Sequence, residues 1–316
     1  MEKYSRWRDA GTGIQPFLPP VPPRTDSSFL VTLSNIVHTI AGSVQGLIKL
    51  PVILLLSLCY VLFVSILGSL LTPIKPLKRA WQTLFSTILT RFILFFMGFF
   101  HIKTETVSIR KSRGNIKSGS VKDGDIIISN WTSYVDILYL AYKFNPVFTQ
   151  VYSNTTQVKK ISLWQAIRSV NQIPPATPTS TVYDIKELSL KAKEQGWGPI
   201  VIFPEGTTTN GRALLKFVPL SFDDVDLNRF HLLSFKYEYG SMPPTFTIGN
   251  QWIHFFKLCS QFHNSLNVRM LAKGELDSDI LASLGHLSKL RKTNLTMNDK
   301  RDFLVYYESR NKKKIS

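Results

Sequence analysis

The most pronounced pattern in the chain is an apolar run from Leu50 to Leu71 that contains no charged residue. As a helix, this run is long enough to cross the roughly 30 Å hydrocarbon core of a bilayer. It starts too late and is too long for a signal peptide. The alternative is the buried helix of a soluble protein.

A second apolar stretch runs from Leu84 to Phe100 and carries Arg91 near its middle. A charged side chain inside a bilayer is costly unless it reaches a headgroup or a partner. We therefore expect an interfacial or re-entrant helix that packs against the first as an N-terminal membrane helical hairpin. A hairpin that crosses the bilayer twice stays open.

Beyond residue 104, short apolar runs of β type alternate with amphipathic segments. This alternation predicts an α/β fold, with a mostly parallel sheet flanked by helices. The expected strands are Asp125–Asn130, Pro146–Tyr152, Pro199–Phe203, Phe230–Tyr239 and Leu266–Lys273, and the expected helices are Ser133–Phe144, Ile161–Val170, Val182–Gln195, Gly249–His263 and Asp299–Lys314. The chain thus divides into a Pro/Gly-rich arm (1–30), the hairpin (31–104), the α/β domain (105–275) and a basic helical tail (276–316).

The composition and charge of the chain limit the kinds of molecule that it is expected to bind. The formal net charge is +17, and a basic chain with an apolar segment and no nucleic-acid motif suits anionic lipid and CoA better than DNA. The two cysteines, Cys59 and Cys259, fall in or near apolar runs. Neither a disulfide framework nor a metal site is expected, and a reducing, cytosol-facing compartment fits this usage.

Two polar turns follow predicted strands. The segment Phe203–Gly211 places one carboxylate, two glycines and three hydroxyls directly after a strand. Ligands of open α/β sheets bind at this end of a strand, and freed N–H groups there can hold phosphate. An ordinary surface turn is the alternative. The second turn lies within Ile126–Asp136, between a strand and a helix that starts near Ser133.

Together the two turns resemble the membrane glycerolipid acyltransferases of the lysophosphatidic acid acyltransferase type. In that family a strand ends in Asn-His-x-x-x-x-Asp, and Phe-Pro-Glu-Gly-Thr follows some seventy residues later. Asp136 matches the aspartate, and the second block matches residue for residue at Phe203, Pro204, Glu205, Gly206 and Thr207. The continuation to Gly211 is similar to the branch that acylates lysophosphatidylcholine and lysophosphatidylethanolamine.

The opening of the chain is similar to fungal members of this family that use oleoyl-CoA at the endoplasmic reticulum and on lipid droplets. The similarity rests on Trp7-Arg8-Asp9 and on Pro16-Phe17-Leu18-Pro19. The resemblance implies a 1-acylglycerol-3-phosphate O-acyltransferase with acyl-CoA as co-substrate and no other cofactor. It implies lysophosphatidic acid or another lysophospholipid as acceptor, and membrane lipid as a partner. The oligomeric state stays open.

Trp131 stands where the family carries histidine. Imidazole takes up a proton near neutral pH, whereas the indole N–H only donates. Either another group is the base, positioning alone carries slow chemistry, or catalysis is lost. Asp136 could itself act on the acceptor hydroxyl through water, with a pKa raised by burial. A lysolipid- or phosphatidic acid-binding protein without catalysis is therefore the alternative function.

The other candidate residues have two readings each. Thr132 and Ser133 either donate to an oxyanion or phosphate, or cap the following helix. The family uses the second block to shape the acceptor pocket, which implies substrate contacts for Asn210 and Gly211 as well. Arg212 and Lys216 either pair with phosphate or form a solvated face.

The chain ends with two lysines third and fourth from the C-terminus, Lys313 and Lys314. This resembles the dilysine retrieval signal of endoplasmic reticulum membrane proteins. An ordinary solvated basic tail is the alternative. With the signal, we expect the endoplasmic reticulum membrane and the lipid droplet surface, and an active site that faces the cytosol.

Overall fold

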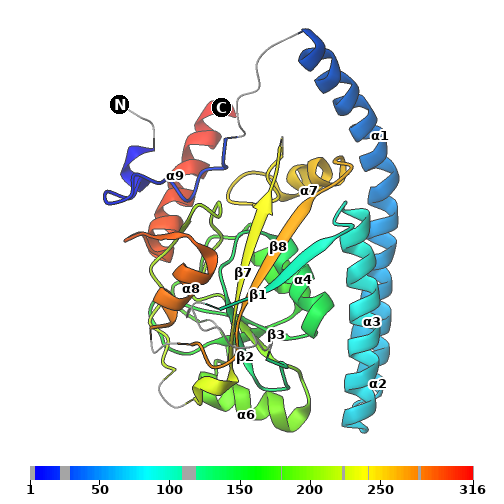
Figure 1. Ribbon diagram of the computed structural model, residues 1–316, viewed down its shortest axis with the longest axis vertical. Coiled ribbons are helices and arrows are strands. Elements are labelled where there is room, and N and C mark those ends of the chain that lie inside the picture. Colours follow the sequence, from blue (N-terminus) through cyan, green and yellow to red (C-terminus); the bar gives the residue numbers. More distant parts are fainter. Residues whose placement is uncertain are drawn as a thin grey trace.

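A computed structural model describes residues 4–21, 29–108, 119–178, 180–222, 225–240, 242–276 and 279–315, with side chains described outside 29–38 and 311–315. The two C-terminal lysines of the predicted retrieval signal lie outside the described side chains. Among the described residues, a seven-stranded sheet forms the centre of the molecule, with helices on both faces (Figure 1).

The sheet is mixed, with strand order β1-β8-β7-β2-β5-β3-β4. Four of its six neighbouring pairs are parallel, and β7–β8 and β3–β4 are antiparallel. The expected mostly parallel arrangement therefore holds for the centre, while both flanks contain an antiparallel pair. The strands are β1 (Ile102–Val107), β2 (Ile126–Ser129), β3 (Val147–Gln150), β4 (Lys159–Ile161), β5 (Ile200–Ile202), β7 (Phe230–Glu238) and β8 (Ser265–Leu271), and β6 (Ala213–Leu214) pairs with β9 (Arg291–Lys292) in a separate sheet.

Helices cover the two faces of the sheet because alternate strand residues point to opposite sides. Ile127 of β2 packs into one core cluster, with residues of α3 and α4. Its neighbours Ile126 and Ile128 pack into the other, with residues of α6 and α8. The helices are α1 (Phe29–Tyr60), η2 (Val61–Leu67), α2 (Gly68–Leu70), α3 (Lys75–Phe96), α4 (Tyr134–Phe144), α5 (Leu163–Ser169), α6 (Ile185–Gln195), α7 (Gln251–Cys259), α8 (Ile280–Ser288) and α9 (Met297–Ile315), with short 3-10 turns at Ser5–Trp7 and Leu227–Arg229.

All five predicted strands and all five predicted helices exist, with ends displaced by a few residues. Strand β1 was missed because its sequence, Ile-Lys-Thr-Glu-Thr-Val, is largely polar. It pairs in parallel with β8 at the edge of the sheet, where polar side chains are tolerated. The boundary drawn at residue 104 therefore falls inside a strand of the α/β domain.

The segment from Thr39 to Leu70 is, among the described helices, long and apolar enough to cross a membrane by length and composition. It passes from α1 through the π-helical segment η2 into α2. Helix α3 runs beside α1 (Figure 1) and also packs on α4. One face of α3 thus belongs to the core of the domain, with Leu89, Ile93 and Leu94 buried. The domain thus partly buries the second helix of the expected membrane hairpin, and the hairpin itself stays a prediction.

Arg91 on α3 has partners of its own. Its guanidinium donates to the Phe99 carbonyl at 2.8 Å and to the Phe100 carbonyl at 2.6 Å. These carbonyls lie just beyond the C-terminus of α3, where helix carbonyls lack partners and a cation is favoured. Arg91 therefore stabilises the C-terminal end of α3 by satisfying two carbonyls that follow it.

Two glycines allow α1 to approach α7 closely. A Cβ at Gly42 would lie 2.6 Å from the Ser260 carbonyl oxygen, and one at Gly46 would lie 2.6 Å from Ser260 Oγ. Further along the same helix, Ile53 and Tyr60 are buried in the core cluster. Helix α1 is thus attached to the domain over much of its length.

We expect Gly42→Leu to loosen the packing of α1 on α7, because its side chain would overlap backbone that cannot move aside. Overpacking of this kind costs about 1–3 kcal/mol. The measurement is the thermal unfolding midpoint of the full-length chain in detergent. Ala41→Leu is the matched control, since Ala41 is exposed. Equal midpoints for the two variants would contradict this account of the contact.

Candidate active site

The two polar turns identified in the sequence meet at one edge of the sheet. Strands β2 and β5 are parallel neighbours, so the turns that follow them lie side by side. The Trp131 backbone joins them twice. Its N–H donates to Glu205 Oε1 at 3.2 Å, and its carbonyl accepts from the Thr209 N–H at 3.0 Å. A strand order that brings residues 131 and 205 together is thus the basis of the site.

Asp136 organises the first turn. Its Oδ2 accepts from the Thr132 N–H and the Ser133 N–H, both at 2.8 Å, and from Thr132 Oγ1 at 3.1 Å. Its Oδ1 accepts from the Tyr237 hydroxyl at 2.5 Å. The carboxyl is fully buried, which raises its pKa to about 6, while these hydrogen bonds act in the opposite direction. The pKa is raised as expected from the sequence, but the carboxylate is enclosed by donors.

Thr132 and Ser133 both bond within the fold. Ser133 is the N-cap of α4, where its Oγ accepts from the Val135 N–H at 3.2 Å, and it donates to the Pro244 carbonyl at 2.7 Å. The Thr132 hydroxyl donates to Asp136. Of the two readings given for this pair, the structure therefore supplies the contacts of helix capping.

Glu205 joins three parts of the site from a fully buried position. Besides the Trp131 N–H, it accepts at Oε2 from the Leu215 N–H at 2.9 Å. Burial raises the pKa of Glu205 to about 8, the two backbone donors lower it, and the charge of Asp136 raises it further. Glu205 thus fixes the turn after β2 to the chain after β5, in the role of a structural bridge.

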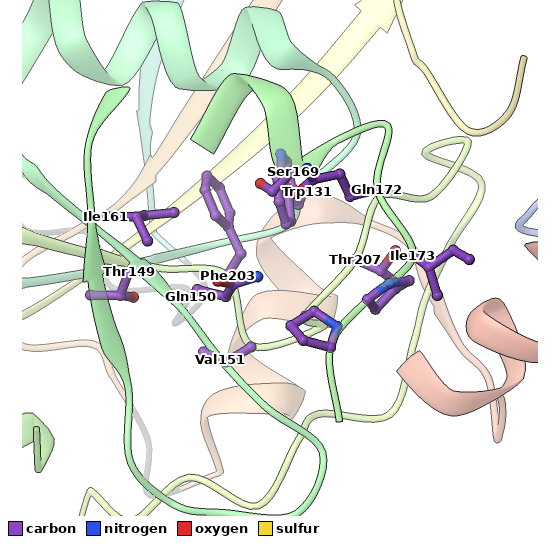
Figure 2. A pocket seen from close by; sticks show the side chains of 13 residues that line it. Trp131, Thr149, Gln150, Val151, Ile161, Ser169, Gln172, Ile173, Phe203 and Thr207 are labelled. Atoms are coloured by element: carbon purple, nitrogen blue, oxygen red, sulfur yellow. The ribbon is translucent and has the colours of Figure 1, made fainter. Parts of the chain in front are cut away.

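Trp131 forms a wall of the pocket between the turns (Figure 2). Its ring stacks on Phe203 with centroids 4.7 Å apart and planes inclined by 15°. Its Nε1 is buried without a hydrogen-bond partner among the described residues. The pocket has a volume of about 20 Å³, which is room for little more than one water. The remaining walls are Thr149, Gln150, Val151, Ile161, Ser169, Gln172, Ile173, Pro174, Pro175, Gly206 and Thr207.

Gly206 is required by its conformation and its neighbour. Its φ is +67°, and a Cβ there would lie 2.2 Å from Met297 Sδ and 3.2 Å from Val151 Cγ2. Any side chain would therefore be strained and would displace the start of α9. Pro204 beside it is buried, and its carbonyl accepts from the Val218 N–H.

Asn210 binds the N-terminal arm. Its Nδ2 donates to the carbonyls of Gln15 and Leu18 at 2.8 and 2.9 Å, and its N–H donates to the Pro16 carbonyl at 2.9 Å. Its Oδ1 accepts from the Arg212 N–H. Asn210 thus holds residues 15–18 beside the site, and its substrate contact stays a prediction.

The remaining predicted residues lie around the pocket rather than in it. Gly211 has φ +71° and lies next to Thr132, with 3.5 Å between a Cβ built on Gly211 and Thr132 Cγ2. The side chains of Arg212 and Lys216 are exposed. Of the predicted set, Trp131, Phe203, Gly206 and Thr207 meet at the pocket. Asp136 and Glu205 are not among its described lining residues.

Sequence reasoning missed Tyr237 and the loop that follows α5. Tyr237 lies about a hundred residues after its partner Asp136 and carries no local motif. The loop had a signal, the consecutive prolines Pro174 and Pro175 that line the pocket. Among the described residues, no three His, Cys, Asp or Glu side chains lie together as a metal site.

The chain is similar to known acyltransferases. Residues 90–224 match the family model described as "Acyltransferase". Over its whole length the chain is 27% identical to a Schizosaccharomyces pombe protein named "Putative lysophosphatidic acid:oleoyl-CoA acyltransferase", and the alignment also covers all of that protein. It is 26% identical to the Arabidopsis thaliana "Lysophospholipid acyltransferase LPEAT2" over 62% of the chain, which spans 34% of that protein.

A crystal structure of the 1-acyl-sn-glycerophosphate (LPA) acyltransferase PlsC from Thermotoga maritima aligns with 78% of this chain and 94% of that one. The sequence identity is 12% and the TM-score is 0.35. At this level the likeness carries no argument about the site.

We expect the stability of the protein to fall as pH rises from about 4.5 to 8, because of Glu205. In this window the folded protein keeps a proton on Glu205 that the unfolded chain has released. The stabilisation is complete below about 4.5 and is lost as pH approaches 8. Glu205→Gln carries no titrating proton, so its unfolding midpoint should change less across the window. Parallel pH curves for the two proteins would contradict the raised pKa.

Proposed function

From the acyltransferase-family domain that the chain carries over residues 90–224, we propose that the protein is an acyl-CoA-dependent lysophosphatidic acid acyltransferase, with oleoyl-CoA as donor. The product is phosphatidic acid, a precursor of phospholipid and triacylglycerol. Acceptors with other headgroups are the nearest variant, because the chain is also similar to a lysophospholipid acyltransferase. No metal or further cofactor takes part in the proposed reaction.

One observation supports this proposal above the others. The Asp136 turn and the Phe203–Gly211 segment lie far apart in the sequence and are joined through Trp131, Glu205 and Thr209. Glycerolipid acyl transfer needs one pocket that holds both the hydroxyl and the thioester. The two hydrogen bonds on the Trp131 backbone bring the two turns together beside one pocket, which supports this proposal.

The proposed reaction has a simple balance. The acceptor hydroxyl oxygen attacks the thioester carbonyl, the C–S bond breaks, and CoA leaves as a thiol with the proton that the hydroxyl gives up. Asp136 takes that proton through water once the pocket has opened. A pKa of about 6 keeps its carboxylate ionised at neutral pH and close enough to neutrality to return the proton.

We also propose that the protein sits in one leaflet of the membrane. Contacts of α1 and η2 with the domain extend from Gly42 to Val64, about 33 Å of helix at 1.5 Å per residue. That length matches the hydrocarbon core, so α1 cannot cross the bilayer without taking the domain with it. Exposed apolar side chains on α1, η2, α2 and α3 include Val44, Leu47, Leu55, Leu58, Leu62, Ile66, Leu70, Leu84, Ile88 and Phe92.

The proposed cellular location follows from a helix that lies in one leaflet. The endoplasmic reticulum membrane and the lipid droplet surface both offer a cytosolic leaflet, and a droplet has only a monolayer. A helix that lies within one leaflet fits both surfaces, with the site open to cytosolic acyl-CoA.

A second function is favoured by a specific observation, the replacement of the family's histidine by Trp131. Every oxygen of Asp136 already accepts a hydrogen bond, and neither the indole nor the phenol of Tyr237 is a base at neutral pH. Burial and Asp136 raise the pKa of Tyr237 well above its ordinary value. A protein that binds lysolipid or phosphatidic acid without turning it over would have such a site.

Turnover separates the two functions. We expect the purified full-length chain to transfer oleate from labelled oleoyl-CoA to lysophosphatidic acid, at a rate that falls as pH drops through about 6. Asp136→Asn should abolish this rate, because the amide cannot take the proton. If no acceptor-dependent product forms at any pH, the acyltransferase proposal is refuted, and the lipid-binding function without catalysis remains.

The substitution Trp131→His tests what the indole replaces. A base installed at this position should raise turnover by roughly 10²–10⁴-fold if proton transfer limits the rate. Trp131→Phe is the control for lost volume and stacking. An equal decrease in both variants would mean that the indole itself is needed, and that the base lies elsewhere.

A further inference from the structure

A second cavity borders the same β3–β4 hairpin as the first pocket, and neither of the two motifs accounts for it. It measures about 260 Å³ and opens between η2, the start of α3 and the α/β domain. The two cavities share both strands of the hairpin. Lys160 of β4 lines the second cavity, and its neighbour Ile161 lines the first.

One wall of the cavity comes from a π-helical segment. Tyr60, Val64 and Ser65 lie in or beside η2, and all three line the cavity. Two donors from α3 satisfy carbonyls in this segment, since Trp81 Nε1 donates to the Phe63 carbonyl at 3.0 Å and Gln82 Nε2 to the Val64 carbonyl at 3.3 Å. Such segments are rare and frequently mark functional sites.

The cavity is positively charged. Lys78 and Lys160 both line it, and no Asp or Glu is among its described lining residues. Burial and the charge of Lys78 together lower the pKa of Lys160. The nearby carboxylate of Asp123 forms an ion pair with Arg79, with 3.3 Å between Arg79 Nη2 and Asp123 Oδ1. Two lysines that share one cavity repel each other, and an anion placed between them would remove that repulsion.

Aromatic side chains complete the walls. Lys160 Nζ lies 3.3 Å from the ring centroid of Trp197. Trp164 packs edge-on against Tyr60, with centroids 5.7 Å apart. The Nε1 of Trp164 is buried and has no hydrogen-bond partner among the described residues. An indole N–H without a partner offers a hydrogen bond to an oxygen acceptor, and the flat rings suit an aromatic base or a lipid glycerol.

We propose that this cavity is a binding site for a phosphate ester, in which Lys78 and Lys160 hold the phosphate and Trp164 donates to one of its oxygens. Two sources share this chemistry. One is the phosphorylated adenosine of CoA, which rests on the proposed function and would reach the first pocket along the β3–β4 hairpin. The other is the headgroup of an anionic phospholipid beside η2, where lysine and tryptophan are common at the membrane interface.

Direct binding tests the site without turnover. The full-length chain in detergent is titrated with adenosine 3′,5′-bisphosphate in a calorimeter, and binding to phosphatidylcholine vesicles made with or without phosphatidic acid is measured by flotation. The test variant is Lys78→Gln with Lys160→Gln. The matched control is Lys75→Gln with Lys159→Gln, which removes the same charge from the same two elements outside the cavity.

We expect the test variant to lose at least about tenfold in affinity for one of the probes, and the control to stay within about twofold of the unchanged protein. Loss with the nucleotide assigns the site to CoA, and loss with the acidic vesicles assigns it to a lipid headgroup. Trp164→Phe should weaken the same probe, because it removes the N–H and keeps a ring.

Equal binding of both probes by the test and control variants would overturn the proposal, as would binding of neither probe by the unchanged protein. Equal unfolding midpoints of the two variants show that each is folded. A protein that binds the nucleotide but never transfers an acyl group would keep this site and refute the proposed function.

Discussion

The candidate site depends on one buried carboxyl group, that of Glu205. It accepts hydrogen bonds from the backbones of Trp131 and Leu215, which belong to segments that no other described side chain ties together in this way. A buried carboxyl group is costly unless it has hydrogen-bond partners, and unpaired buried N–H groups are costly as well. The Glu205 side chain and the two backbone N–H groups therefore stabilise each other. The position of Trp131, and with it the shape of the pocket, follows from this mutual requirement.

Helix α9 and the N-terminal arm extend this constraint to the ends of the chain. Met297 packs against Gly206, Arg301 donates to the Pro174 carbonyl through Nε and Nη2, and Lys300 donates to the Thr247 carbonyl at 2.7 Å. Lys300 is 1% exposed, and burial lowers its pKa to about 7. A tail that reads as a basic, solvated helix thus supports two walls of the pocket, at Gly206 and Pro174, and also holds the segment at Thr247.

Trp131 gives the pocket a character that differs from the motif of the acyltransferases that the chain resembles. The indole stacks on Phe203 and fills space, whereas an imidazole can take up a proton near neutral pH. In this chain the Tyr237 hydroxyl donates to Asp136. The aspartate keeps a donor on Oδ1, but that donor has a raised pKa and remains protonated at neutral pH. Asp136 is therefore held by a phenol that is not a base at neutral pH.

The sequence by itself determined the elements whose residues carry a local signal. The apolar runs of β2 and β5, the capped start of α4 and the Pro-Glu-Gly turn all follow from periodicity and turn chemistry, which act over a few residues. Tertiary structure alone decided the partner of Asp136, the use of Asn210 to hold the arm, and the placement of polar β1 beside β8. These depend on strand order and on contacts between distant residues, where the stabilising energy comes from packing and pairing that no short window of sequence contains.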